Sequence, residues 1–391
     1  MTHVRTGLAV LAAEPSRLGP AERVGLLTGP TGITASLDRN VEALRAAGIP
    51  LAALLGPEHG VTGTAQAGAS EGDGVDEATG LPTIDTFAVR DHLDQTIEAL
   101  GLDTIVYDIQ DAGARFWTFT WSMYDTMLVA ARLGVRFVIL DRPNPIQATI
   151  VEGPDLDPSC ASFVGRVAIP QRHGLTLGEL GRLFNAQFVP TAAGRPVELD
   201  VITMEGWQRD ASYASTGLPW VTPSPNIPTV DSAYAFAATC LIEGTNVSEG
   251  RGTTHPFELF GAPYVDARLI PALRARELPG VEFREAWFQP TFHKYAGQAV
   301  RGAQLYVTDV DAYRAVPVGV GILATLAELY RDDFAVLDPV SDQDSPTTDY
   351  ALDRLWGSPS LRTALAAGDD PTSLVPAAET PDRYPAGTLL Y

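Results

Sequence analysis

Short apolar runs alternate with helix-like segments over the first 150 residues, and this alternation limits the possible folds more than any other feature. Four runs have the length of a buried strand: 23–27, 50–55, 103–109 and 135–140. Three segments between them carry helical periodicity: 38–47, 91–100 and 118–133. Each crossover must carry the chain back across the sheet, so this order predicts a parallel sheet with helices on both faces. We therefore expect a Rossmann-like α/β domain over residues 1–150.

The residue pattern of the chain changes after residue 150. Prolines recur from Pro219 to Pro228, where they exclude a helix and restrict each preceding residue. Thr176 followed by Glu179 predicts a capped helix start. Further elements are expected near 230–240, 268–275, 281–288, 302–307, 318–331 and 349–356. We expect a connecting segment over 151–265, with proline-rich and Glu/Gly-rich loops, and a second α/β (α+β) domain over 266–391.

Unusual polar residues follow three of the four predicted strands. They are Glu58 and His59 after the second strand, Asp108, Gln110, Asp111 and Arg115 at the third, and Asp141, Arg142 and Asn144 after the fourth. Ligands of open α/β sheets bind at this carboxyl edge. No G-x-G-x-x-G follows any strand, so a dinucleotide site loses its main support. The long segment 60–80 is expected to be functional or mobile.

Acidic side chains dominate the candidate loops. The catalytic candidates are Glu58, His59, Asp108, Glu243 and Glu249. Hydrolysis of a glycosidic bond needs one carboxyl group that donates a proton and one that acts as base or nucleophile. Other readings stay open, because His59 with Asp108 and Asp111 has the ligand chemistry of a metal site, although metal-binding spacing is absent. Asp108 and Asp141 would equally serve as helix caps or bind loop amides.

The charge of the chain narrows the class of partner. With 27 basic and 48 acidic side chains, the net charge is −21, so nucleic acid or an anionic membrane surface would be repelled at long range. The basic residues of the candidate loops therefore stand out: Arg115, Arg142, Arg251 and Lys294. Arginine in such a loop commonly holds a carboxylate or phosphate through a bidentate bond.

Cysteine use and hydropathy bear on the compartment. Cys160 and Cys240 are too few for a disulfide framework and are expected to be buried thiols. No apolar window approaches the roughly 20 residues of a membrane span, and the apolar run 7–13 lacks a convincing signal-peptide pattern. We expect a soluble, cytoplasmic protein, with secretion by another route left open and the oligomeric state undetermined.

Seven motifs resemble those of the bacterial exo-β-N-acetylmuramidase family. They are G-P-E-H-G from Gly56, Y-D-I-Q-D-A-G-A-R-F from Tyr107, L-D-R-P-N-P from Leu140, R-H-G-L-T-L-G-E-L from Arg172, P-S-P-N-I-P from Pro223, E-G-T-N-V-S-E-G-R-G-T-T-H-P-F-E from Glu243 and K-Y-A-G from Lys294. The match runs in order from about residue 20 to the C-terminus, so it covers nearly the whole chain.

The resemblance implies two α/β domains with the active site in the cleft between them. It also implies release of N-acetylmuramic acid from the non-reducing end of peptidoglycan fragments, a small carbohydrate substrate, without a metal or organic cofactor. By position, Glu58 would be the leading catalytic carboxylate, with His59 beside it and the loop 243–251 facing it. We expect Arg115, Arg251 or Lys294 to hold the lactyl carboxylate. The other expected substrate contacts are Gln110, Asp141, Arg142, Asn144, Asn226, Asn246 and Tyr295.

Departures from the family pattern concern the fit of the substrate. His293 stands where serine is common and Gln298 where glutamate is usual, so a related sugar or a decorated muramyl group remains an option. The alternatives to a glycosidase are a non-catalytic binder of muramyl or other small anionic ligands and a metal-assisted hydrolase. The sequence does not give the distance between the carboxylates, so it does not distinguish a retaining from an inverting mechanism.

Overall fold

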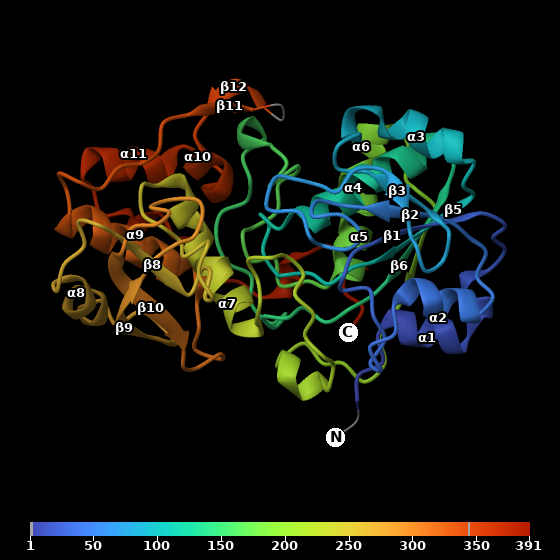
Figure 1. The fold of residues 1–391 in the computed structure, drawn as a ribbon, viewed down its shortest axis with the longest axis horizontal. Helices are drawn as coiled ribbons and strands as arrows, with labels where there is room; N and C mark the ends of the chain where they lie inside the picture. Colours follow the sequence, from blue (N-terminus) through green and yellow to red (C-terminus); the bar gives the residue numbers. More distant parts are fainter. Residues whose placement is uncertain (1–2, 343–344) are drawn as a thin grey trace.

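The computed structural model describes residues 3–342 and 345–391, and Figure 1 shows two sheet-based parts side by side. The first part is built on a seven-stranded sheet of order β3-β4-β2-β1-β5-β6-β7. Its strands are β1 (Val24–Thr28), β2 (Leu51–Gly56), β3 (Gly74–Val75), β4 (Pro82–Asp85), β5 (Thr104–Asp108), β6 (Arg136–Leu140) and β7 (Leu199–Ile202). Neighbouring strands pair in parallel except β3 and β4, which are antiparallel. The predicted Rossmann-like parallel sheet is confirmed.

Helices cover both faces of this sheet. Leu26 of β1 packs in a cluster with α1 (Gly7–Ala13) and α2 (Asn40–Ala46) on one face. Its neighbour Leu27 packs in the cluster that contains α3 (Leu93–Leu100), α4 (Thr118–Leu133) and α5 (Leu177–Gln187) on the other. Adjacent residues of a strand point to opposite faces, so a sheet covered on both sides has continuously apolar strands.

The second part is built on a three-stranded antiparallel sheet of order β8-β10-β9. Its strands are β8 (Leu259–Ala262), β9 (Val281–Phe288) and β10 (Val300–Val307). The helices that pack with it and around it are α7 (Val230–Thr239), α8 (Leu269–Ala275), α9 (Ala315–Leu329), α10 (Ala351–Trp356) and α11 (Ser360–Ala367). The small strands β11 (Val340–Asp342) and β12 (Ser345–Asp349) pair with each other. An antiparallel sheet with helices makes this part α+β, within the predicted class.

Short elements complete the chain. They are the helix α6 (Val189–Ala193) and the 3-10 turns η1 (Pro15–Leu18), η2 (Arg90–His92), η3 (Pro158–Cys160), η4 (Tyr213–Thr216), η5 (Cys240–Gly244), η6 (Pro371–Leu374) and η7 (Pro381–Arg383). Both cysteines are free and buried, as expected. None of the helices in the described part of the chain has the length and hydrophobicity that a bilayer crossing requires.

Several elements differ from the sequence-based expectation. The pattern did not predict α1, β4, β7, β8 or α11, because short elements carry too few residues for a clear period. The helix α9 begins at Ala315 and not at residue 318, so Pro317 lies in its first turn, where the missing N–H costs nothing. Within the range 151–265, β7 joins the first sheet while β8 joins the second.

Candidate active site

One cavity of about 330 Å³ is lined by loop and helix residues from both parts of the molecule. The first part contributes Glu58, His59, Gln66, Ala67, Gly68, Phe116, Trp117, Thr118, Phe163, Val164, Ser224 and Ile227. The second part contributes Phe236, Cys240, Glu243, Arg251, Phe257, Phe292, His293 and Leu355. Its size lies at the lower end of the roughly 300–1,000 Å³ typical of ligand sites, and its mixture of aromatic and charged walls suits an amphipathic ligand.

Glu58 lies just beyond the carboxyl end of β2 and is 4% exposed. Its two carboxylate oxygens accept hydrogen bonds from different elements, one from the backbone N–H of Gly68 and one from the hydroxyl of Thr118 at the start of α4. Donors on both sides fix the orientation of the carboxylate. The side chain is therefore held in a single position at the wall of the cavity.

His59 adopts a left-handed backbone conformation, with φ at 72°. Such a conformation is uncommon outside glycine, and here hydrogen bonds of the backbone and of the ring hold it in place. The backbone N–H of His59 donates to the carbonyl of Ala69 at 2.9 Å, and Nδ1 lies 2.9 Å from the carbonyl oxygen of Ala65. A carbonyl only accepts, so this contact requires the proton on Nδ1, and in the neutral ring Nε2 then carries the lone pair.

The glycine-rich segment after Glu58 is folded over the cavity by a single carboxylate. Glu71 accepts hydrogen bonds from the backbone N–H groups of Thr62 and Thr64, at 3.1 and 3.0 Å, and from both hydroxyls. Burial raises the pKa of Glu71, but these hydrogen bonds outweigh it and lower the pKa. Asn226 of the proline-rich segment donates a hydrogen bond to the side-chain oxygen of Gln66 at 3.3 Å and so links the two segments.

An acidic and basic cluster forms the facing wall. Arg251 pairs with Glu243 at 3.0 Å from Nε and lies 3.4 Å from Glu249. His293 contacts the same oxygen of Glu249 as Arg251, at 3.2 Å, and Lys294 contacts the other oxygen at 2.9 Å. Burial would raise the pKa of Glu249, but the hydrogen bond from His293 and the charges of Lys294 and Arg251 lower it to about 2. Glu249 is thus a fully buried anion behind the wall, whereas Glu243 lines the cavity.

Asp108 lies apart from this cavity, although it was expected to share a site with Glu58. Both carboxylate oxygens of Asp108 are held by Arg142, at 2.6 and 2.9 Å, and one also accepts from Asn40 at 2.7 Å. Gln110 nearby donates to the carbonyl of Pro143 at 2.7 Å. Asp108, Arg142 and Gln110 are buried, so their polar groups are committed to one another and to the backbone.

Asp141 and Asn144 also bind protein groups. Asp141 accepts hydrogen bonds from the backbone of Gly178 at 2.8 Å, the hydroxyl of Thr176 at 2.7 Å and the hydroxyl of Tyr391 at 2.8 Å. Burial raises the pKa of Asp141 to about 6, against the opposing effect of these hydrogen bonds. Asn144 donates to the carbonyl of Leu175 at 2.9 Å. Asp141 thus binds the N-cap hydroxyl and a first-turn amide of α5, so it acts at a helix N-terminus, which was among the alternatives that the sequence left open.

Arg115 is fully buried at the junction of the two parts. Its guanidinium donates to the carbonyls of Pro154, Ile169 and Leu355, at 3.0, 3.1 and 2.7 Å. Burial lowers the pKa of Arg115 to about 10. These carbonyls come from three distant segments of the chain, so Arg115 ties them together and is not exposed to the cavity.

Lys294, Tyr295 and Asn246 anchor the loops behind the facing wall. Besides Glu249, the ammonium group of Lys294 contacts the carbonyls of Ile242, Glu243 and Val247, at 3.2, 3.1 and 2.9 Å. The hydroxyl of Tyr295 donates to the carbonyl of Asn246 at 2.5 Å, and the side chain of Asn246 donates to the carbonyl of Asp333 at 2.7 Å. Of the three cations expected to hold a substrate carboxylate, Arg251 is the one that lines the cavity.

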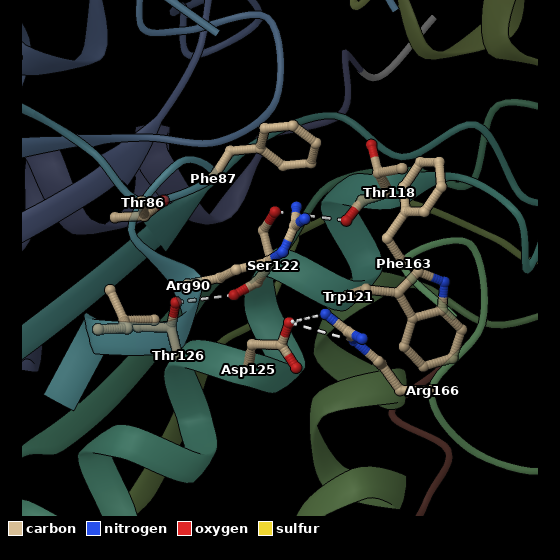
Figure 2. A pocket seen from close by; sticks show the side chains of 11 residues that line it. Thr86, Phe87, Arg90, Thr118, Trp121, Ser122, Asp125, Thr126, Phe163 and Arg166 are labelled. Atoms are coloured by element: carbon tan, nitrogen blue, oxygen red, sulfur yellow. Dashed lines mark hydrogen bonds and ion pairs between the residues drawn. The ribbon is translucent and has the colours of Figure 1, made fainter. Parts of the chain in front are cut away.

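A small hollow next to the cavity shares Thr118 and Phe163 with it (Figure 2). Its volume is about 20 Å³, room for a water molecule and not for a sugar. Figure 2 shows Arg166 pointing at Asp125, with 2.8 Å between Nη2 and Oδ2, below the first turns of α4. This ion pair therefore fastens the segment that carries Phe163 and Arg166 to α4, the helix that begins at Thr118.

The described residues contain no group of three or more His, Cys, Asp or Glu side chains arranged to hold a metal ion. Asp111 lies instead against His173, 3.2 Å away. The sequence did not single out Thr118, Gln66, Gly68 or Phe292 as site residues. A hydroxyl, an amide, a glycine and a phenylalanine carry no motif of their own, and only the folded chain brings them to Glu58 and Glu243.

Two family models match consecutive parts of the chain. The description of the first is exo-beta-N-acetylmuramidase NamZ, N-terminal, and it matches residues 24–231. The second, exo-beta-N-acetylmuramidase NamZ, C-terminal, matches residues 234–382. Together they span both walls of the cavity.

Similar proteins cover nearly the full length of the chain. Peptidoglycan beta-N-acetylmuramidase NamZ of Bacillus subtilis (strain 168) is 42% identical over 375 residues, which is 95% of this chain and 86% of the relative. Two crystal structures of DUF1343 family proteins from Bacteroides fragilis NCTC 9343 share the fold. One has a TM-score of 0.84 and 31% identity over 96% of this chain and 95% of its own. The other has a TM-score of 0.71 and 25% identity over 94% and 92%.

Proposed function

Because the chain belongs to the exo-β-N-acetylmuramidase NamZ family, we propose that it is a glycoside hydrolase that releases N-acetylmuramic acid from the non-reducing end of peptidoglycan fragments. The observation that carries the proposal is the placement of Glu58. Its carboxylate is fixed by Thr118 and Gly68 at the wall of a sugar-sized cavity, and Glu243 lines the same cavity from the second part. Two carboxyl groups on one cavity are what hydrolysis of a glycosidic bond requires.

In this proposal Glu58 exchanges a proton with the glycosidic oxygen, and Glu243 is the second carboxylate. The hydrogen bonds from Thr118 and Gly68 orient Glu58 before the substrate arrives, which removes a positioning cost from the reaction. Glu243 pairs with Arg251, an arrangement suited to an ionised carboxylate. Asp108 and Glu249 are not assigned to the reacting groups, since each is buried and paired with cations.

We assign the recognition of the sugar to the other polar groups of the cavity. Nε2 of His59 can accept a hydrogen bond from a substituent of the ring, because Nδ1 is held by Ala65. Arg251 is the cation best placed for the lactyl carboxylate that distinguishes N-acetylmuramic acid from N-acetylglucosamine. His293 also lines the cavity and contacts the same oxygen of Glu249 as Arg251, so it adds a second basic group beside Arg251.

The test is product analysis by mass spectrometry after incubation with the β-1,4 disaccharide of N-acetylmuramic acid and N-acetylglucosamine. We expect the wild type to release N-acetylmuramic acid, and Glu58→Gln to lose at least about 100-fold in kcat with an unchanged melting temperature. Glu282→Gln, an exposed acid on β9, is the matched control and should keep full activity. Full activity of Glu58→Gln would refute the assignment. Tight binding of the disaccharide by the wild type without turnover would favour the non-catalytic alternative.

The expected cytoplasmic location remains a proposal. Its support is that both cysteines are unpaired and buried, as is usual in a reducing compartment. Fractionation of cells that produce the untagged chain tests it, and recovery in the culture medium would overturn it.

A further inference from the structure

We propose that Phe292, with Phe163 on the opposite wall, forms a binding site for the second pyranose ring of the substrate, the sugar that leaves when the bond is cut. The inference rests on the proposed function and extends it from the released sugar to its neighbour. The groups named so far belong to the buried, catalytic end of the cavity, and this inference assigns residues to the side of the leaving sugar.

Phe292 is exposed although it is large and apolar. Among the residues that the structure describes, six large hydrophobic side chains are exposed, and Phe292, at 38%, is the one that also lines the cavity. Exposed apolar side chains at the rim of a pocket commonly mark a binding surface. The exposure is therefore informative because it coincides with the opening of the site.

The loop that carries Phe292 is built to present it. Thr291 donates from its backbone and its hydroxyl to the carbonyl of Gly252, both at 2.9 Å. The side chains of Lys294 and Tyr295 donate behind the facing wall, to the carbonyls of Val247 and Asn246. His293 and Tyr295 have φ values of 67° and 57°, a left-handed conformation that costs energy in residues with side chains. A loop strained and fastened in this way holds Phe292 at the rim in a fixed position.

Phe163 reaches the same cavity from the first part of the molecule. It lies in a tight turn closed by the pairing of Ser162 with Gly165, whose backbone N–H and carbonyl groups bond at 2.7 and 3.1 Å. Val164 beside it also lines the cavity. Two apolar surfaces from separate loops thus border the cavity, each held by its own backbone hydrogen bonds.

The chemistry of the substrate fits this layout. Glu58 is 4% exposed and Phe292 is 38% exposed, so the cavity runs from a buried carboxylate to an open aromatic rim. An enzyme that removes a terminal sugar holds that ring at the buried end, and the remaining chain must leave toward the opening. Pyranose rings carry a face of C–H groups that packs on aromatic rings, whereas their hydroxyls stay in water. The leaving sugar would therefore lie against Phe292 and Phe163.

The experiment compares two substrates that differ only on the leaving side. One is the β-1,4 disaccharide with N-acetylglucosamine as the leaving group, and the other is methyl β-N-acetylmuramide, whose methyl group is too small to pack on a ring. We expect Phe292→Ala to lower kcat/KM about tenfold for the disaccharide and to leave the methyl glycoside unchanged. Phe292→Tyr should restore the disaccharide rate. Trp287→Ala is the control, because Trp287 is 65% exposed on the same hairpin and does not line the cavity.

Each outcome separates this inference from the proposal on which it rests. Equal losses on both substrates would overturn it, since Phe292 would then support the site as a whole. Unchanged rates on both would also overturn it, because the leaving sugar would pass elsewhere. A wild type that releases N-acetylmuramic acid from neither substrate would instead refute the proposed function.

Discussion

Replacing Glu249 with glutamine tests whether the anion behind the facing wall holds the site loops together. The carboxylate is fully buried and contacts Lys294, His293 and Arg251. Its pKa is lowered from an ordinary 4.5 to about 2, a difference that corresponds to about 3 kcal/mol of stability at neutral pH. Breaking a buried ion pair by removing one partner costs a similar 3–5 kcal/mol, roughly, because the remaining charges are left uncompensated. We therefore expect Glu249→Gln to lower the free energy of unfolding by about 3 kcal/mol at pH 7.

The pH dependence gives this prediction its sign. A carboxyl group with a lowered pKa in the folded state stabilises the protein above its unfolded pKa, and that stability is lost as the pH falls toward the folded pKa. The gap between wild type and Glu249→Gln should thus be constant above about pH 5 and shrink by about 2 kcal/mol between pH 4.5 and 3. Other carboxylates are common to both proteins, so they cancel in the difference.

Equilibrium urea unfolding across this pH range measures the gap. Tryptophan fluorescence and circular dichroism should be followed together, since coincident transitions justify the two-state treatment. Glu285→Gln is the control, because Glu285 pairs with Arg301 at 2.6 Å but is half exposed, and exposed pairs contribute about 1 kcal/mol or less. A gap below about 1 kcal/mol for Glu249→Gln, or one that does not narrow in acid, would refute the reasoning.

Two further substitutions separate orienting groups from scaffolding groups. Thr118→Val removes the hydroxyl that holds Glu58, so we expect kcat to fall about tenfold while KM stays constant. Thr118→Ser keeps the hydroxyl and should keep the rate. Steady-state kinetics on the disaccharide measures both variants, and a valine variant with full kcat would contradict the prediction. Arg115→Met leaves three buried carbonyls without their donor, so we expect the free energy of unfolding, measured by urea titration, to fall by about 3 kcal/mol. A raised KM with unchanged stability would instead show that Arg115 contacts the substrate.

The parallel sheet was predictable because its strands are buried on both faces. Each core strand is a continuous apolar run, and 118–133 carries a helical period long enough to fix both of its ends. The strands β7 and β8 were not predictable in the same way. Each has four residues, and β7 has a half-exposed surface, so neither run stands out from a loop.

The candidate site was predictable only where a residue carries chemistry of its own. Glu58, Glu243 and Arg251 stand out in the sequence as charged groups in loops, and the structure places them on one cavity. The sequence could not separate Arg251 from Arg115, because both follow glycine-containing loops. Burial makes the difference: three backbone carbonyls from distant segments surround Arg115, a tertiary arrangement with no local signature.

The carboxyl edge of the sheet explains why the cavity lies where it does. In the order β4-β2-β1-β5-β6, the direction of winding reverses between β1 and β5, and open α/β sheets commonly bind their ligand at that point. Here Asn40 fills this place by donating to Thr28 and Asp108, at 2.8 and 2.7 Å, and Arg142 completes the buried network. With that crevice occupied by the protein's own side chains, a ligand has to bind one strand away. The end of β2 meets this need, because Glu58 emerges there toward loops of the second part, which supply the opposite wall.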